Sequence, residues 1–183
     1  MIHISGSAHR SFIFPADLPT AYAYYSDLGY ILNFLPQIYI TRTYAEQEFR
    51  VCYTSTELGA YQVDIFCDLR AELDDEAPAL RLGPLNGMTP ANAKAGFRST
   101  SASGYFASQS LFFAAPNGET RIEYRLELKA QLPTPKALRF MPAVVVDSIA
   151  GSITHRRIAE IAEGFIKRSI NAFPDWVGEL GQD

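Results

Sequence analysis

Residues 121–131 alternate without a break between apolar and polar side chains. Ile122, Tyr124 and Leu126 begin the apolar row, and charged residues fill the positions between them. Because successive side chains of a strand point to opposite faces, the pattern predicts an antiparallel strand with one buried and one solvated face. The buried face must then be covered by another element of the chain.

The element best able to cover this face lies near the C-terminus. A helix is predicted over residues 143–172, ending before Pro174, and at 1.5 Å per residue it would span about 45 Å. A shorter helix is expected over residues 135–141, with Thr134 as its N-cap and Pro135 in its first position.

The other elements complete an α+β fold. A first strand is expected over residues 9–14, and Asp17 is the predicted N-cap of a helix that runs to Ser26. A second short helix, over residues 28–35, ends before Pro36. Further strands are expected over residues 37–45, 47–57, 61–73, 79–85, 98–115 and 119–132. We therefore expect a curved antiparallel sheet of about seven strands wrapped around a long C-terminal helix.

Length and composition suit this arrangement. The chain has 183 residues, enough for one domain over residues 1–183 with its core at about 9–176. A formal net charge of −4 argues against nonspecific electrostatic binding of nucleic acid. No apolar run reaches the roughly 20 residues that span a bilayer, and the first residues lack the features of a signal peptide. The expectation is a cytoplasmic protein without a transmembrane segment.

Cross-strand pairing predicts the register of the hairpin that turns at residues 58–60. Pairing Val51 with Cys67 also places Arg50 beside Asp68, so that apolar meets apolar and opposite charges meet. A slip by one residue would put Cys52 opposite Cys67 and move one apolar row to the wrong face. We therefore predict two reduced thiols that point to opposite faces of the sheet.

A second hairpin is predicted to turn at Asn117-Gly118, the dipeptide most typical of two-residue hairpin loops. That turn pairs Tyr124 with Leu111 and points Tyr105 and Gln109 into the apolar face. A buried Gln109 amide needs a partner, which would be a backbone group, a water molecule or a bound ligand. The two hairpin registers turn three aromatic side chains outward, to be covered by another element or by a second copy of the chain in a homodimer: Phe66, Phe106 and Phe112.

Motifs that carry catalytic or metal chemistry are not found in the sequence. None of the three histidines, His3, His9 and His155, is spaced to share a metal ion. The acidic run at residues 74–76 lacks the ligand spacing of a calcium loop and suits a solvated turn. The sequence contains no phosphate-binding glycine loop, no nucleophile elbow and no paired-cysteine zinc motif. We expect no cofactor and no metal.

The order of elements resembles the START, polyketide-cyclase and pollen-allergen (SRPBCC) superfamily, whose fold is the helix grip. The resemblance covers about residues 9–176, and it is closest to a START-like family of cyanobacteria and plastids. The closer likeness is carried by four short motifs: Phe34-Leu35-Pro36, Leu132-Pro133, Phe140-Met141-Pro142 and Phe173-Pro174-Asp175-Trp176. It implies a hydrophobic cavity between the sheet and the long helix, and no shared catalytic residues.

The predicted ligand is an apolar small molecule or lipid, bound in that cavity by apolar walls with a few polar points. The expected ligand-binding residues are tyrosines on inward positions, small and apolar residues of the helix, Gln109, and two residues of the irregular segment 86–97: Tyr22, Tyr25, Tyr53, Tyr61, Met88, Phe97, Tyr105, Gln109, Tyr124, Thr154, Ile158 and Phe165. The segment 86–97 is interpreted either as a mobile gate or as a surface excursion. The alternative for the tyrosines is that their rings reach the rim of the fold and their hydroxyls are solvated. The alternative for the small helix residues is close packing of the helix on the sheet.

Two other functions stay open at this point. A cyclase or aromatase would need an acid or base inside the cavity, and the registers place the charged strand residues outside, leaving Arg98 as the remaining candidate. A protein-interaction module would use the exposed sheet edge and the outward phenylalanines. His155, Arg156 and Arg157 are expected on a wet face of the helix, which is either solvated or in peripheral contact with anionic lipid head groups.

Overall fold

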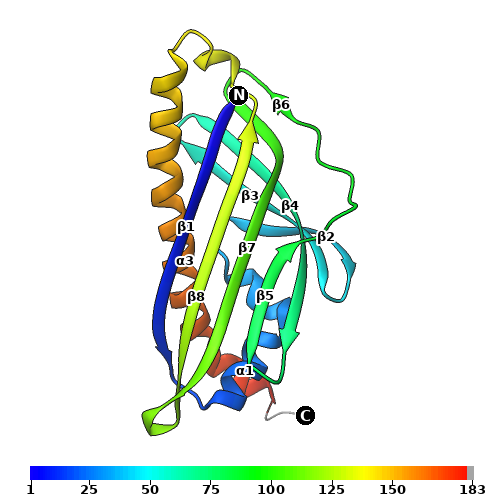
Figure 1. Cartoon of the computed structure of the whole chain (residues 1–183), viewed down its shortest axis with the longest axis vertical. Helices are drawn as coiled ribbons and strands as arrows, with labels where there is room; N and C mark the ends of the chain where they lie inside the picture. Colours follow the sequence, from blue (N-terminus) through cyan, green and yellow to red (C-terminus); the bar gives the residue numbers. More distant parts are fainter. Residues whose placement is uncertain (181–183) are drawn as a thin grey trace.

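A long helix lies against one face of a single sheet in the computed structural model, which describes residues 1–180 (Figure 1). The strands are β1 (Ile2–Phe14), β2 (Ile38–Ala45), β3 (Glu48–Glu57), β4 (Tyr61–Asp74), β5 (Ala79–Pro84), β6 (Lys94–Ala95), β7 (Ser99–Ala115) and β8 (Glu119–Leu132). The helices are α1 (Leu18–Ser26), α2 (Leu28–Ile31) and α3 (Ala143–Leu180), with short 3-10 turns η1 (Leu32–Phe34), η2 (Pro116–Gly118) and η3 (Lys136–Leu138).

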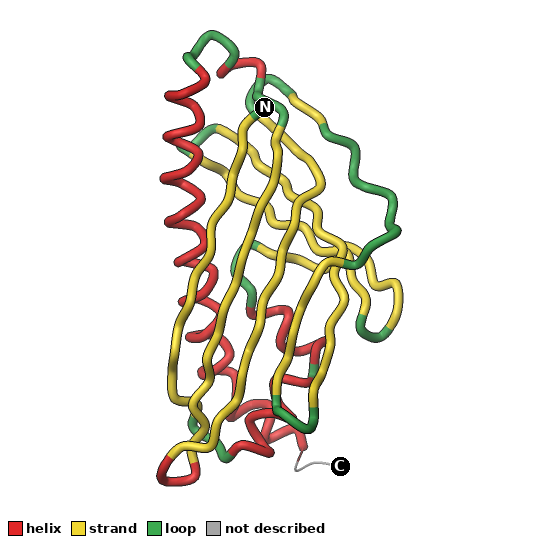
Figure 2. Tube along the Cα trace, in the orientation of Figure 1, coloured by secondary structure: helices red, strands yellow, loops and turns green. Residues whose placement is uncertain are grey.

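The sheet follows the order β1-β8-β7-β5-β4-β3-β2, and β6 adds a short pairing to β7 (Figure 2). Its pairings are antiparallel except where β4 and β7 run parallel over residues 62–66 and 99–103. The predicted α+β helix-grip architecture is confirmed. Among residues 1–180, no helix combines the length and apolarity that crossing a membrane requires.

Helix α3 packs directly on β1, the strand at one edge of the sheet. This strand begins at Ile2 rather than at residue 9, because Ile2 pairs with Leu132 and the pairing continues to Phe14. Gly6 allows the close approach of the helix, since a Cβ atom there would overlap the side chain of Ile158. The helix thus covers the apolar face that the alternation in β8 requires.

The register predicted for the first hairpin is confirmed. Val51 pairs with Cys67 and Arg50 with Asp68, whose carboxylate accepts a 2.7 Å hydrogen bond from Arg50 Nε. The loop between β3 and β4 places Leu58 and Gly59 at positive φ, the conformation that a tight turn requires. Both cysteines are free, as predicted.

The thiols of Cys52 and Cys67 give a direct test of this packing. Burial raises the pKa of Cys52 to about 11 and that of Cys67 to about 12, so both remain protonated near neutral pH. The thiolate is the reactive form. We expect neither thiol of the native protein to react within minutes with dithiodipyridine at about pH 8, and both to react at once in denaturant. Rapid reaction of either thiol in the native state would contradict this packing.

The register predicted for the second hairpin is wrong by one residue. Tyr124 pairs with Ser110, and Gln109 pairs with Arg125 on the opposite face. The cause is Pro116, which has no N–H for the closing pair of a two-residue loop. The loop takes three residues instead, with Asn117 and Gly118 at positive φ.

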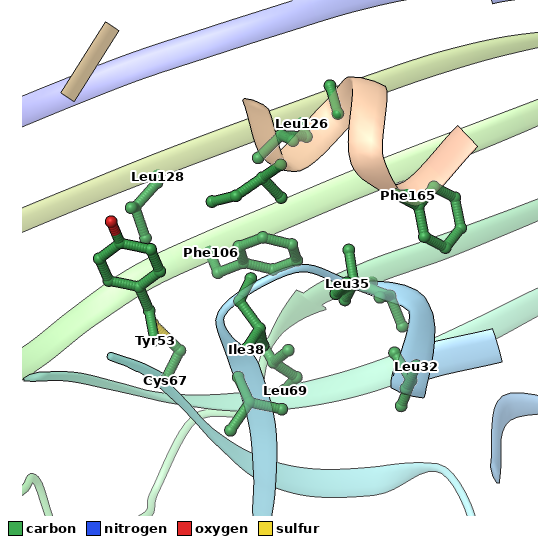
Figure 3. Close-up of a cluster of buried hydrophobic side chains, with 14 of the residues drawn as sticks. Leu32, Leu35, Ile38, Tyr53, Cys67, Leu69, Phe106, Leu126, Leu128 and Phe165 are labelled. Atoms are coloured by element: carbon green, nitrogen blue, oxygen red, sulfur yellow. The ribbon is translucent and has the colours of Figure 1, made fainter. Parts of the chain in front are cut away.

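This correction exchanges the two faces of β7. Phe106 and Phe112, expected outside, are 2 % and 4 % exposed, and Figure 3 shows Phe106 within the buried cluster. Tyr105 and Gln109, expected inside, pair with residues of the solvated row of β8. Phe66 keeps its predicted outward position opposite Cys52 and is half-buried.

The C-terminal helix begins at Ala143, as predicted, but it extends beyond its predicted end. It does not stop before Pro174 but continues through it to Leu180, because Phe173 and Trp176 on either side pack against the buried ring of Tyr24. The expected helix over residues 135–141 is only the turn η3, and Thr134 does not cap it. Proline at both 135 and 142 leaves little room for a longer helix there.

Candidate functional site

A cavity of about 220 Å³ lies between the first half of α3 and the sheet. Its walls come from β1, the β3–β4 hairpin, β7, β8, η3 and α3. The apolar lining residues are Ile2, Ile4, Leu58, Val63, Ile65, Leu128, Leu132, Pro135, Leu138, Met141, Val146, Ile149, Ala150 and Ile153. The polar ones are Tyr53, Ser55, Glu57, Tyr61, Thr100, Thr154 and Arg157.

The cavity forms where α3 carries small and short side chains toward the sheet. Ala150 and Thr154 lie one turn apart on its cavity side, and the Thr154 hydroxyl donates back to the Ala150 carbonyl at 2.8 Å. The Thr100 hydroxyl is likewise satisfied, by the Pro133 carbonyl at 2.6 Å. These two hydroxyls therefore present little free hydrogen-bonding capacity to the cavity.

The mouth of the cavity is apolar. Leu58 of the hairpin loop is 64 % exposed, and Met141 and Ile149 beside it in the lining are 38 % and 36 % exposed. Phe140 and Val144, in the same stretch of chain, are also exposed but do not line the cavity. The exposed part of the cavity lining is therefore hydrophobic.

Three of the predicted ligand-binding residues line this cavity: Tyr53, Tyr61 and Thr154. Five others pack in the solid core or beside it: Tyr22, Tyr25, Tyr124, Ile158 and Phe165. The Tyr25 hydroxyl is satisfied by Ser169 Oγ at 2.9 Å, and the Tyr22 hydroxyl donates to Asp75 at 2.8 Å. The space between the second half of α3 and the sheet is therefore filled by aromatic side chains and contains no cavity lined by these residues.

The remaining four predicted residues lie on the outer side of the sheet or on the segment 86–97. Tyr105 is covered by the Lys129 ammonium, and Gln109 lies on the solvated row of β7. Phe97 is 66 % exposed, with the exposed Arg98 over its ring. Met88 precedes Thr89, whose carbonyl accepts from Arg50 of the outer row, and between β5 and β6 the segment runs along the edge away from α3 (Figure 2).

A partly buried ion pair, which was not predicted from the sequence, forms the polar end of the cavity together with Tyr53 and Ser55. Arg157 Nε donates to Glu57 Oε1 at 2.9 Å and Nη2 donates to Oε2 at 3.1 Å, while Nη1 donates to Glu160 at 2.6 Å. Burial would raise the pKa of Glu57, but the hydrogen bonds from Arg157 outweigh it and hold that pKa below its usual value of 4.5. Glu57 is therefore ionised at neutral pH.

Both partners carry a signal in the sequence. Glu57 continues the inward row of β3 after Tyr53 and Ser55, because strand residues two apart share a face. Arg157 lies three residues after Thr154 and four before Ile161, which is the spacing of one helix face. Its expected place on the wet face beside His155 and Arg156 is thus wrong, although those two neighbours are exposed.

Ser55 is the other notable polar residue of the cavity. It is 6 % exposed, and its Oγ has no hydrogen-bond partner among the described residues. The side chains of Tyr53 and Glu57 are its polar neighbours. The Ser55 hydroxyl is close enough to help lower the pKa of Glu57, although neither contact has the geometry of a hydrogen bond. Among residues 1–180, no group of three or more histidine, cysteine, aspartate or glutamate side chains is arranged to hold a metal ion.

Comparison with known proteins shows similarity in structure and not in sequence. No protein-family profile matches the chain, and no curated protein matches it. A conserved protein of Geobacillus kaustophilus superposes with a TM-score of 0.54 at 8 % identity, over 92 % of this chain and 95 % of its own. The Thermus thermophilus protein TTHA0849 gives 0.52 at 14 % identity, over 91 % of this chain and 98 % of its own.

Human STARD10 superposes with a TM-score of 0.52 at 10 % identity, over 94 % of this chain and 66 % of its own. Together with the open antiparallel sheet and the long C-terminal helix, this likeness shows that the chain has the START-type helix-grip fold. At such identities the likeness concerns the fold alone.

Proposed function

We propose that this protein binds a hydrophobic small molecule or a lipid-like molecule in the cavity between the sheet and α3. The observation that carries the proposal is a cavity with apolar walls, an apolar mouth and a single polar end. This combination is typical of small-molecule sites, in which a few placed polar groups orient a ligand held by apolar contact. The START-type fold supports the same interpretation, since a hollow between sheet and helix is what that resemblance implies.

The size of the cavity limits its occupant. Its volume of about 220 Å³ exceeds the ~150 Å³ that holds a benzene molecule in an engineered cavity. It is smaller than the roughly 300–1,000 Å³ of pockets that enclose drug-sized ligands. The enclosed part of the ligand is therefore about the size of a substituted ring or a medium-length alkyl chain, and a longer molecule would extend through the mouth.

Binding is favoured over catalysis by the state of Glu57. It is the only carboxylate among the described residues that line the cavity. A general base works best with a pKa near the working pH, whereas the pKa of Glu57 is lowered and both its oxygens accept from Arg157. Arg98, the candidate from the sequence, is exposed and does not line the cavity.

Filling the cavity tests the proposal. Ala150 is half-buried in the wall, and an indole at this position would occupy the space in front of Thr154. We expect Ala150→Trp to weaken binding of medium-chain apolar probes at least tenfold, measured by calorimetric titration, without unfolding the protein. Ser152→Trp, on an exposed position of the same helix, is the matched control and should bind as the unaltered protein does. Equal binding by both variants would place the ligand elsewhere.

A further inference from the structure

The polar end of the cavity contains one hydroxyl without a hydrogen-bond partner and a carboxylate that can accept further hydrogen bonds. Ser55 offers a buried hydroxyl with no partner among the described residues, and an unmade hydrogen bond at a buried site is unfavourable. The Glu57 carboxylate has capacity beyond the two bonds from Arg157, and the Tyr53 hydroxyl lies 3.5 Å from its Oε1. A ligand atom placed here could accept a hydrogen bond from Ser55 and donate one to Glu57.

The positive charge at this end is already neutralised. Each of the three nitrogens of the Arg157 guanidinium donates to a carboxylate, two to Glu57 and one to Glu160. An anionic head group would therefore find no uncommitted cation and would face the buried carboxylate of Glu57. A cationic head group would have to compete with an existing bidentate pair while losing its own hydration.

We propose that the cavity selects an uncharged amphipathic ligand with a hydroxyl head group, seated between Ser55 and Glu57, over a carboxylate of the same chain length. This inference rests on the proposed binding function and adds the chemical class of the ligand. The apolar body of the ligand lies along Val63, Leu128 and Ala150, and its hydroxyl satisfies the free Ser55 group.

The test compares three eight-carbon probes: 1-octanol, heptyl methyl ether and octanoate. The ether has the same atoms as the alcohol but no hydrogen-bond donor, and the octanoate ion carries a negative charge. We expect 1-octanol to bind the unaltered protein about tenfold more tightly than either of the other two, in calorimetric titrations at neutral pH.

Two variants locate the selectivity. Ser55→Ala should weaken 1-octanol binding about tenfold, because it removes the free hydroxyl while leaving the cavity its shape. Ser110→Ala removes another buried hydroxyl of the sheet, outside the cavity, and should bind 1-octanol as the unaltered protein does. Thermal unfolding of both variants establishes that they are folded.

The outcomes separate this inference from the function on which it rests. If none of the three probes binds, the proposed binding function itself fails. If they bind with equal affinity, or octanoate binds most tightly, the cavity holds apolar molecules but the head-group selection is overturned. Unchanged 1-octanol affinity in Ser55→Ala would likewise overturn the assignment of Ser55.

Discussion

Replacing Phe14 with alanine is expected to lower the free energy of unfolding by about 3–5 kcal/mol, the usual range for removing a fully buried phenylalanine. Phe14 ends β1 and is 0 % exposed. Its ring lies 4.8 Å from that of Phe173 and 5.3 Å from that of Tyr25, measured between centroids, and it stacks on Tyr24 at 5.5 Å. The change would therefore leave a hole where α1, β1 and the end of α3 meet.

Chemical denaturation followed by circular dichroism measures this loss. Phe97→Ala is the matched control, because Phe97 is 66 % exposed and its removal should change stability by no more than about 0.5 kcal/mol. A loss below about 1 kcal/mol for Phe14→Ala would mean that the cluster does not hold α3 in place.

Replacing Arg157 with methionine is expected to lower stability by about 3 kcal/mol near pH 8, the lower end of the range for breaking a buried ion pair. The variant keeps the apolar stem but leaves the Glu57 carboxylate, 8 % exposed in its side chain, without its main partner. The double variant Glu57→Gln with Arg157→Met removes the stranded charge. It should therefore lose less stability than the Arg157→Met variant alone.

The loss caused by Arg157→Met should depend on pH with a definite sign. In the unaltered protein the lowered pKa of Glu57 contributes stability that is present above about 4.5 and is lost as the pH falls through the lowered pKa. Without Arg157, burial dominates and raises this pKa, so the carboxyl group destabilises the fold as the pH rises through the raised value. The difference between the two proteins should thus shrink from about pH 8 to about pH 5.

Arg156→Met provides the matched control for this prediction. Arg156 has a side chain that is 63 % exposed and lies 3.6 Å from Glu160, so its loss should change stability by less than about 1 kcal/mol. Equal losses for Arg156→Met and Arg157→Met, or a difference that grows toward low pH, would contradict the assigned role of the Glu57–Arg157 pair.

The parts of the fold that could be predicted are those in which local and cross-strand signals agree. In the hairpin of β3 and β4, charge pairing and apolar pairing select one register, and Arg50 and Asp68 meet as expected. Strand β8 alternates so regularly that its buried row was predictable even though its partner was placed wrongly. The long C-terminal helix could be predicted because its segment is long and carries apolar side chains along one helical face.

The errors arose where a single dipeptide or a single proline decided the prediction. Asn117-Gly118 favours a two-residue loop, but Pro116 before it cannot close one, and this moved Tyr105 and Gln109 to the outer face. Pro174 predicts a helix end, yet the helix continues because the aromatic packing on both sides of it outweighs a lost hydrogen bond. Neither the loop length at Pro116 nor the continuation of the helix through Pro174 can be predicted from the local sequence alone.

The site was predicted only in part because sequence periodicity gives the face of a residue and not its depth along an element. Thr154 lines the cavity, whereas Ile158 and Phe165, further along the same face of α3, are buried in the solid core. The ion pair was missed because Glu57 and Arg157 are 100 positions apart in sequence and each is charged. Only the topology shows that the tip of the hairpin meets the helix.

Under the proposed binding function, the uneven packing beneath α3 has a consequence for how a ligand would enter the cavity. From Ile158 onward, α3 is anchored by contacts with aromatic side chains. Before Ile158, only Val146 and Thr154 of this helix are buried. Loosening the first few turns would open a passage beside Met141 and Ile149 while the far end stayed locked. A ligand could then enter and leave without separation of the whole of α3 from the sheet. Backbone deuterium uptake should therefore be fastest in the first turns of α3 and slow around Phe165 and Trp176.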